Sequence, residues 1–414
     1  MSCLPDEREI NIETGLSFLY LCETRLLEAS VPRVDVKMTP SRAVEESMEI
    51  VDSLLMRQGR TLQHKNRAIV KQKIAGVQEK TALYITLSVM VISKWTSSDI
   101  DAVSALPGTV IDLIKHLFSS LENEFGKNMT RSALAILTFA RKGISDIEME
   151  DILSMNDDIL NSVFTYHKPT VRRLPTHVWL RLKGAMGGLI VEGESGCFQW
   201  YHRQLKETAE KEYLSEKLIV HSLMAHYFGN LRDDNLFGRQ TRKISCQPWV
   251  FRELPFHSKS VPNARRCCEA AHHMILNGLF EDAEDEVCNF EGICSKIRCG
   301  EGFQLIYEFS KIIEMCKLSN RTPSEKLLHY YKWLRQDIHF LSKNALATFV
   351  ASASHQPKIS IVRKEVTNLN SVRQVKTFGT FDIFNQMLSK LEGHSREVSS
   401  VAFSPDGQTL ASGS

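Results

Sequence analysis

Two residues that could do chemistry lie close together in the stretch 193–204. Cys197 could act as a nucleophile, and the imidazole of His202 could act as a base or donate a hydrogen bond to an anion. Their odd separation along the chain would place them on opposite faces of a strand, and no carboxylate is evident that would orient the imidazole. The sequence therefore disfavours a hydrolase with a cysteine nucleophile.

Phosphoryl transfer would need residues that the sequence does not contain. There is no G-x-x-x-x-G-K-[ST] motif, whose backbone amides and lysine bind phosphates, and the nearest Gly-Lys pair, Gly126-Lys127, is followed by Asn128. Nor does an apolar strand end in paired acids that would hold a magnesium ion. We therefore expect that this chain is not an enzyme and holds no cofactor by itself.

The ten cysteines predict core packing and no metal site. They are scattered without a C-x-x-C pair, and the group Cys288, Cys294 and Cys299 has neither zinc-like spacing nor a clustered histidine. We interpret the cysteines as reduced thiols of a cytoplasmic protein, because oxidised pairs are rare in that compartment.

The composition predicts a multidomain globular protein. Its 414 residues allow about two to four domains, and a net charge of +2 gives no electrostatic footprint for nucleic acid or for an anionic membrane. The most apolar run lies between Lys80 and Lys94, which is shorter than the roughly 20 apolar residues of a membrane span. We expect a buried helix or strand there, and neither a nucleic-acid nor a membrane partner.

Three helical segments precede His202 and would have to position it. The first, 129–141, has apolar residues on nearly all sides, and Gly143 after it predicts a left-handed stop. The second begins at Ser145-Asp-Ile-Glu148, which is typical of a capping box because the serine and the glutamate can each satisfy the other's backbone N–H. Thr176 is the predicted N-cap of the third.

A predicted hairpin separates the third helix from the helix that follows His202. The apolar runs 189–192 and 197–201 flank a turn in which Gly193 and Gly196 are available for positive φ. The resulting order of helix, helix, helix, hairpin and helix predicts a winged helix.

DNA binding is the alternative function, because many winged helices place their third helix in the major groove. Here that helix would offer only His177, Arg181 and Lys183 to the nucleic acid. Phosphate contacts dominate the affinity of DNA-binding proteins, so the nearly neutral charge of the chain disfavours this alternative.

Helical periodicity continues after the winged helix and then stops. Four further helices are expected at 218–228, 270–279, 305–316 and 326–341. Beyond them, Ser, Thr, Asn and Val predominate, which is typical of a linker and extended strands.

The last residues have the pattern of a WD repeat. Gly393-His394 is followed by apolar Val401 and Phe403, by the turn sequence Ser404-Pro-Asp-Gly407, and by Leu410-Ala-Ser-Gly-Ser414. A propeller blade needs about four strands, and a single repeat unit cannot bury its own apolar face. We therefore expect the polypeptide to continue beyond residue 414 in nature.

Nearly the whole chain resembles the NACHT and WD-repeat proteins, members of the STAND class of signal-transduction ATPases, in which a nucleotide switch precedes a propeller. Besides the WD pattern, the resemblance rests on segments in a characteristic order: Ser2–Glu7, Leu121-Glu122 with Phe125-Gly126, Arg141–Ser145 with Glu148 and Glu150, Trp200–Arg203 with Tyr213, Glu253–His257, and Cys288–Glu291.

The resemblance implies a role for His202. In STAND proteins, a histidine after the last strand of the wing contacts the β-phosphate of bound ADP, and His202 matches that position. Arg203 replaces the family's following Asp, and Ala82 stands where the lid usually has a proline near adenine. A purely structural interpretation, in which His202 caps the next helix, stays open. ADP or ATP would bind in the full-length parent and not in this chain alone.

The resemblance also implies the organisation and the partners. The fold class is mainly α, with a helical lid, a winged helix with a small β-hairpin wing, a helical array and the first strands of a truncated propeller. The expected boundaries are 1–34 for the C-terminal remnant of the nucleotide-binding core, 35–117 for the lid, 118–215 for the winged helix, 216–345 for the array, 346–388 for a linker and 389–414 for an incomplete first WD repeat. We expect a regulatory and scaffolding segment whose parent binds protein partners through its propeller and self-assembles.

Overall fold

A computed structural model describes residues 40–77, 81–95, 106–166, 173–193, 196–229, 231, 262–343, 346–368, 400–403 and 410–413. Within these ranges the structure is mainly α-helical and has two small antiparallel sheets of two strands each, so the predicted fold class is confirmed. The chain forms two compact units, Met1–Leu117 and Phe118–Ser414, which divide inside helix α6 (Val110–Phe125). The expected core remnant at 1–34 lies outside the described residues.

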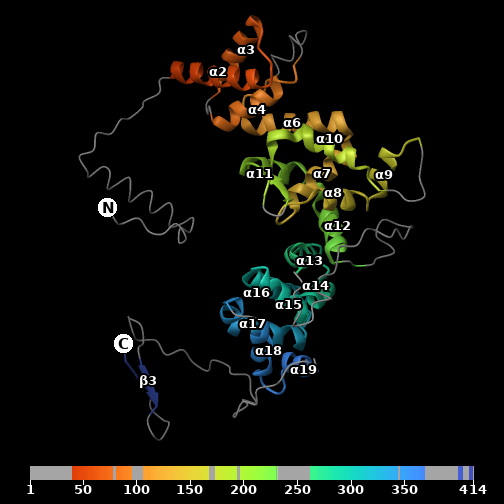
Figure 1. The fold of residues 1–414 in the computed structure, drawn as a ribbon, viewed down its shortest axis with the longest axis vertical. Helices are drawn as coiled ribbons and strands as arrows, with labels where there is room; N and C mark the ends of the chain where they lie inside the picture. The colour runs from red at the N-terminus through yellow and green to blue at the C-terminus, as the bar shows by residue number, and fades with distance from the viewer. Residues whose placement is uncertain are drawn as a thin grey trace. The chain divides into compact units, whose positions relative to one another are not determined.

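The first unit contains helices α2 (Pro40–Arg57), α3 (His64–Gly76) and α4 (Ala82–Ile92), together with the start of α6 (Figure 1). Its core includes Met48, Val51 and Leu55, whose spacing of three and four residues places them on one face of α2. The apolar run after Lys80 is helix α4 and not a strand. Its residues are buried on nearly every side, and the Thr81 hydroxyl caps it by accepting from Tyr84 N–H at 3.2 Å. No helix among the described ranges is long and apolar enough to cross a membrane.

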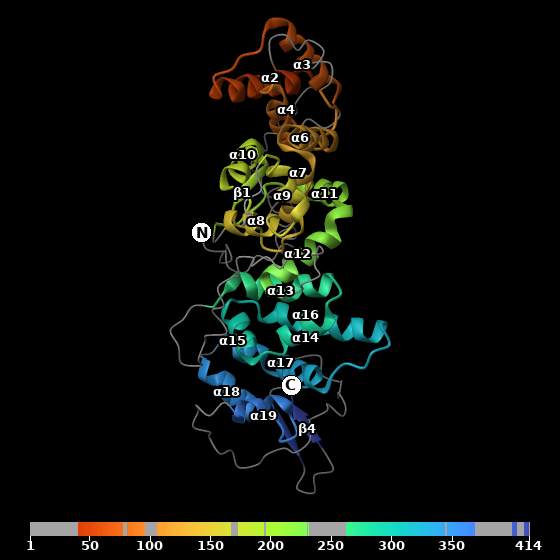
Figure 2. The same ribbon diagram turned by 90° about the vertical axis from the view of Figure 1, so that its right-hand side faces the viewer.

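The second unit begins with a winged helix. It consists of α7 (Lys127–Phe139), α8 (Asp146–Leu153), α9 (Asp157–Val163), α10 (Thr176–Met186), strands β1 (Ile190–Glu192) and β2 (Phe198–Trp200), and α11 (Arg203–Glu212). The strands pair antiparallel, with Ile190 opposite Trp200 and Glu192 opposite Phe198. In Figure 2 this hairpin lies among the winged-helix helices, as the predicted order requires.

Most of the local predictions for the winged helix are confirmed, and of the two turn glycines Gly196 has a positive φ, of 70°. The capping box of Ser145 and Glu148 is present, and Gly143 has the predicted left-handed φ of 76°. The predicted cap at Thr176 is wrong: Pro175 is the N-cap, and the Thr176 hydroxyl instead donates to the Glu150 carboxylate at 3.2 Å. Helix α9 was not predicted, because its seven residues are too few for a clear apolar period.

A helical array follows the winged helix. It comprises α12 (Lys217–Gly229), α13 (Ala264–Leu276), α14 (Phe280–Val287), α15 (Phe290–Arg298), α16 (Gly302–Leu318) and α17 (Glu325–Lys343). Consecutive helices pack on one another, and α12 packs closely on α13. Large buried side chains such as Phe309 and Trp333 fill the interior.

The first part of the expected linker is helical, which corrects the prediction for 346–388. Helices α18 (Leu346–Ser354) and α19 (Ile361–Asn368) pack on α17 and on each other. Phe349 and Val362 are buried there, and the indole N–H of Trp333 donates to the Ser352 hydroxyl at 2.7 Å. The Ser-rich composition of the region concealed these helices, because each is too short to show a clear apolar period.

Two strands are described in the region with the WD pattern. β3 (Ser400–Phe403) and β4 (Leu410–Gly413) pair antiparallel, with Phe403 opposite Leu410. The chain therefore reverses between β3 and β4, and the predicted Ser-Pro-Asp-Gly turn lies outside the described residues.

Candidate functional site

His202 begins helix α11 and caps it. Its backbone is extended, with φ −132° and ψ 144°, and its Nδ1 accepts a hydrogen bond from the backbone N–H of Gln204 at 3.2 Å. An accepting Nδ1 carries a lone pair, so in the neutral ring the proton lies on Nε2. The ring is half-buried, and Nε2–H is its remaining donor. The interpretation that His202 caps the next helix is thus confirmed. Its Nε2 is not used by the cap and could contact a ligand.

Arg203 stands where the family has Asp, and its surroundings differ from those of His202. Its side chain is exposed and pairs along the helix with Glu207 at 2.5 Å. Ala82 begins helix α4, where Thr81 provides the cap. It lies in the other compact unit.

The other candidate nucleophile, Cys197, lies in an unreactive environment. Its side chain is only 4% exposed, and burial raises the pKa of its thiol, with Arg265 opposing that shift. Because the thiolate is the reactive form, this arrangement gives Cys197 no nucleophilic role.

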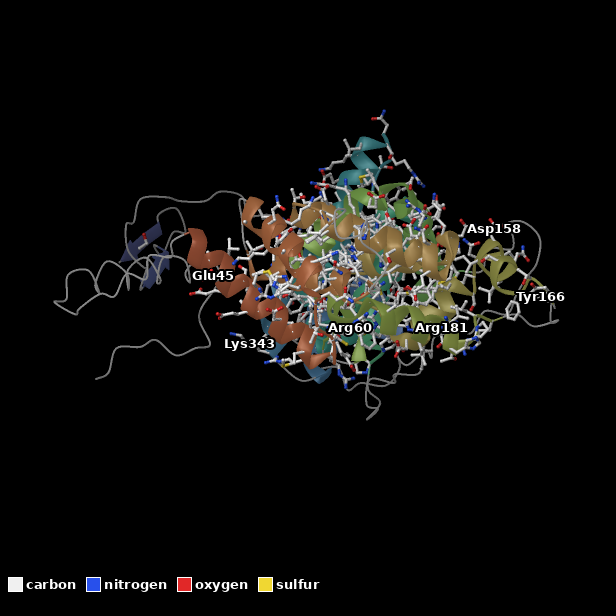
Figure 3. All side chains as sticks on the ribbon, turned by 90° about the horizontal axis from the view of Figure 1, so that it is seen from above. Glu45, Arg60, Asp158, Tyr166, Arg181 and Lys343 are labelled. Atoms are coloured by element: carbon white, nitrogen blue, oxygen red, sulfur yellow. The ribbon has the colours of Figure 1, made fainter. Side chains whose placement is uncertain are left out.

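The basic residues of the third helix make contacts within the protein. The Lys183 ammonium pairs with Asp146 at 2.8 Å and lies 3.5 Å from the ring centroid of Phe198. Arg181, labelled in Figure 3, has an exposed side chain whose guanidinium carbon lies 5.8 Å from the ring centroid of Phe125. Neither contact resembles a row of free cations on a recognition helix, so the described part of this helix gives no support to DNA binding.

The wing contacts the turn that joins α7 to α8, which we call the junction turn (Ala140–Ser145). Ile144 forms a bridge with Phe198 of β2: its N–H donates at 3.0 Å and its carbonyl accepts at 2.8 Å. At Gly143, a Cβ atom would come within 2.5 Å of the Phe198 carbonyl oxygen. Only glycine combines this close approach with the left-handed backbone, so the sequence of the turn fixes how the wing meets it.

Besides the wing, the junction turn contacts helix α13 of the array. The carboxylate of Glu269 accepts from the backbone N–H groups of Arg141, at 3.0 Å, and Lys142, at 2.9 Å. The guanidinium of Arg265 donates to the Gly143 carbonyl at 2.8 Å and to the Glu148 carboxylate at 2.7 Å. Two side chains of α13 therefore bind backbone groups of three consecutive residues of the turn, and Arg265 also binds Glu148 at the start of α8.

Further charge pairs reinforce this contact. Arg141 donates to the Cys268 carbonyl at 2.8 Å and pairs with Glu301 at 2.6 Å, and Lys142 pairs with the same carboxylate at 3.4 Å. Arg265 also pairs with Glu269 one helical turn away, at 3.3 Å. We call Arg141, Glu148, Arg265, Glu269 and Glu301 the junction cluster.

A pair of buried histidines extends the cluster to α12. His273 bonds the Glu269 carboxylate through Nε2 at 3.0 Å, and its Nδ1 lies 2.8 Å from Nδ1 of His221. Glu269 and His273 are fully buried, and His221 is 2% exposed. The line His221, His273, Glu269 thus connects α12, α13 and the junction turn through direct polar contacts.

Burial and neighbouring charges shift the pKa values of Glu269 and His221. Burial alone would raise the pKa of Glu269, but the hydrogen bond and charge of His273, together with Arg265, lower it to about 2. Burial, together with nearby His273 and His272, lowers the pKa of His221 to about 3. At neutral pH Glu269 is therefore an anion and His221 is uncharged.

The junction cluster was missed in the sequence, although a signal for part of it exists. Arg265, Glu269 and His273 are spaced four residues apart, which places them on one face of a helix. The same spacing is common on solvated helix faces, so it does not reveal that the face is buried. Within the ranges that the structure describes, no group of three His, Cys, Asp or Glu residues could hold a metal ion.

The comparisons with known proteins match these parts of the structure. The family model described as NWD1-like, winged helix-turn-helix domain, matches residues 102–221, and the one described as WD domain, G-beta repeat, matches residues 385–414.

Several curated relatives match a longer part of the chain. The human NACHT and WD repeat domain-containing protein 2 is 25% identical over 313 residues, which cover 66% of this chain and 17% of that protein. The human NACHT domain- and WD repeat-containing protein 1 is 26% identical over 224 residues, 50% of this chain and 14% of that protein. Rat telomerase protein component 1 is 22% identical over 330 residues, 76% of this chain and 12% of that protein. The chain spans less than a fifth of the length of each.

Proposed function

Because the chain belongs to the family of NACHT and WD-repeat proteins, we propose that it is a regulatory and scaffolding segment between a nucleotide-binding domain and a WD propeller. The winged helix is the arm that responds to bound nucleotide, and the propeller of the parent protein binds its protein partners. Self-assembly and a cytoplasmic location belong to the same proposal.

The observation that carries this proposal is the continuous path of polar contacts from the wing to the array. His202 lies two residues after the end of β2, β2 is bridged to Ile144, and the Gly143 carbonyl accepts from Arg265 of α13. A buried polar contact of this kind is costly to break, so a displacement of the wing is passed to α13 in preference to being absorbed at the turn. The winged helix and the array would then move as one arm.

His202 is the residue that we propose for the nucleotide contact in the parent protein. Its Nδ1 is used by the cap, which fixes the ring at the start of α11, and its half-buried Nε2–H is the donor suited to a phosphate oxygen. ADP supplies the negative charge that such a donor recognises. Catalysis is not proposed for this segment, because its sequence has no P-loop lysine and no carboxylate pair for magnesium.

The coupling of the arm can be tested by replacing Arg265 with methionine. The variant loses the contacts with Glu148, Glu269 and the Gly143 carbonyl, and we expect hydrogen exchange at the Arg141 and Lys142 amides to rise by at least about tenfold, since breaking a buried pair costs about 3 kcal/mol. Trypsin cleavage after the same two residues should accelerate in parallel.

Arg321→Met is the matched control for that experiment. Arg321 is exposed and pairs with Glu281 at the surface, away from the junction turn. Equal exchange rates at the turn in the two variants would show that Arg265 does not hold the winged helix to the array, and the proposed arm would have to be abandoned.

The role of His202 is separable from its capping role by two substitutions. His202→Asn preserves an N-cap, whereas His202→Ala removes it and should lower stability by about 1 kcal/mol. In a family member that carries the P-loop domain as well as this region, we expect both variants to release ADP faster than the wild type. If His202→Asn retained ADP as long as the wild type does, His202 would cap the helix and would not contact the nucleotide.

A further inference from the structure

Helices α16 and α17 of the array have an exposed face that the proposed function does not use. The two helices pack on each other, and the ring centroids of Phe303 and His339 lie 5.2 Å apart. Phe303 is at the start of α16 and His339 is near the end of α17, so the two helices run antiparallel. This contact fixes which side chains of the two helices are neighbours.

Two rows of side chains with a spacing of four residues line this face. The row on α16 consists of Phe303, Tyr307 and Lys311, and the row on α17 consists of Arg335, His339 and Lys343. Residues four apart lie on one side of a helix, so the antiparallel register places Tyr307 opposite Arg335. We call these six residues the two-helix face.

The aromatic residues of the two-helix face are not part of the core. The side chain of Phe303 is 57% exposed and that of Tyr307 is 52% exposed, although both are large and apolar. Helix α16 is already anchored by Leu305, Phe309 and Ile312, which are fully buried on its other side. Neighbouring exposed aromatic side chains are typical of surfaces that bind other proteins.

The charged residues of the two-helix face are positive. Arg335 and Lys343 are exposed, and among the described residues no carboxylate pairs with either of them. The Lys311 ammonium lies 5.8 Å from the ring centroid of Tyr307 and pairs with Glu314 at 2.8 Å. The face therefore combines an aromatic strip on α16 with unpaired positive charge on α17.

We propose that the two-helix face binds an acidic amphipathic helix of a partner protein. Rows of side chains four residues apart form ridges, and the seam between two packed helices receives the ridges of a third helix. The apolar side of the partner helix would cover Phe303 and Tyr307, and its Asp and Glu residues would pair with Arg335 and Lys343.

Charge complementarity is the reason for choosing an acidic partner. An unpaired guanidinium and an unpaired ammonium beside an apolar strip attract carboxylates and repel a basic helix, which sets specificity as well as affinity. This surface belongs to the array and not to the propeller. The proposal therefore stands independently of the partners of the propeller and of the role of His202.

The first test measures binding of two synthetic peptides to the whole chain by fluorescence anisotropy. Each labelled peptide has about five helical turns, with Leu and Phe repeated along one side; the acidic peptide has Glu beside that side, and the basic peptide has Lys in the same places. We expect the acidic peptide to bind at least about tenfold more tightly. Equal affinities, or tighter binding of the basic peptide, would overturn the proposal.

Variants then locate the binding on the two-helix face. Tyr307→Ser should weaken binding of the acidic peptide by at least about tenfold, because aromatic anchors contribute most of the affinity of such contacts. Tyr166→Ser is the control, since Tyr166 is fully exposed near the end of α9 (Figure 3), and it should bind as the wild type does. Equal losses in the two variants would place the binding elsewhere.

A charge reversal tests the electrostatic part separately. Arg335→Glu should weaken binding of the acidic peptide and strengthen binding of the basic peptide, because it reverses the sign of an exposed and unpaired charge. Arg335 is on the surface, so the variant should fold, and unchanged far-UV circular dichroism checks this. If Arg335→Glu bound both peptides as the wild type does, the proposed pairing with carboxylates would be wrong.

Two other occupants of the face are outcomes of the same experiments. In sedimentation equilibrium we expect Phe303→Ser to have the same mass as the wild type; dissociation of a wild-type dimer by this substitution would show that a second copy covers the face. A labelled thymidine oligonucleotide should bind more weakly than the acidic peptide. Tighter binding that is lost in Tyr307→Ser would assign the face to single-stranded nucleic acid instead.

Discussion

Glu269→Gln is the substitution that tests the junction cluster most directly. The change keeps the shape of a fully buried side chain and removes its negative charge. One amide oxygen can still accept one backbone N–H of the junction turn, but the other N–H then faces an NH₂ group. His273 also loses its anionic partner, and Arg265 keeps only Glu148.

The size of the effect follows from the structure in two ways. A fall in the pKa of Glu269 from 4.5 to about 2 corresponds to about 3 kcal/mol of stability at neutral pH. Removing one partner of a buried ion pair generally costs about 3–5 kcal/mol, which agrees. We therefore expect Glu269→Gln to lower the free energy of unfolding by about 3 kcal/mol.

Urea denaturation followed by tryptophan fluorescence measures this loss on both sides of the junction. Trp179 and Trp200 are buried in the winged helix, and Trp333 is buried in the array. The midpoint should fall by about 1 M urea if m is near 3 kcal/mol per molar. Glu314→Gln is the control, because Glu314 is exposed and pairs with Lys311 on its own helix, and its midpoint should stay at the wild-type value.

The pH dependence supplies the refutation. The pKa of Glu269 is lower in the folded state, so its contribution is complete above about pH 4.5 and is lost as the pH falls towards 2. The stability difference between wild type and Glu269→Gln should therefore shrink over that range. Equal midpoints for Glu269→Gln and Glu314→Gln at neutral pH, or a difference that does not change with acid, would show that the carboxylate does not hold the turn.

Two further predictions concern the same region. Gly143→Ala should destabilise the protein by more than about 2 kcal/mol, because the new Cβ would lie 2.5 Å from the Phe198 oxygen on a left-handed backbone; Gly126→Ala, which has positive φ but open space, should cost clearly less in the same urea titration. His221 has a pKa lowered from 6.5 to about 3, so the unfolded chain binds more protons between these values and the stability that His221 contributes is complete only above about pH 6.5. Between pH 6.5 and 4, the free energy of unfolding should therefore fall by up to about 3 kcal/mol less in His221→Phe than in the wild type. An equal fall in the two proteins would contradict this.

Features that depend on neighbouring residues could be predicted from the sequence. Ser145 and Glu148 form their capping box because both partners lie within one helical turn. Trp179, Leu182 and Met186 are buried together as the helical period requires. A similar argument failed at Thr176, since a hydroxyl before a helix can either cap it or bond elsewhere, and here the Glu150 carboxylate lies within reach.

Features that depend on distant partners could not be predicted in this way. Helices α18 and α19 have only nine and eight residues, too few for a clear apolar period, and both pack on α17. The place of His202 after the wing followed from the sequence, and the tertiary structure added that its Nδ1 is used by the cap.

The sequence by itself determined the main helices and the hairpin of the winged helix, the left-handed stop at Gly143 and the family resemblance, because each arises from local backbone preference or from a pattern of successive residues. Tertiary structure alone decided which of the chain's many charged residues is structurally decisive. Glu269 and the amides of Arg141 and Lys142 are separated by more than a hundred positions, and they interact because α13 packs against the junction turn. Burial at that contact turns an ordinary glutamate into the anion that holds the winged helix to the array.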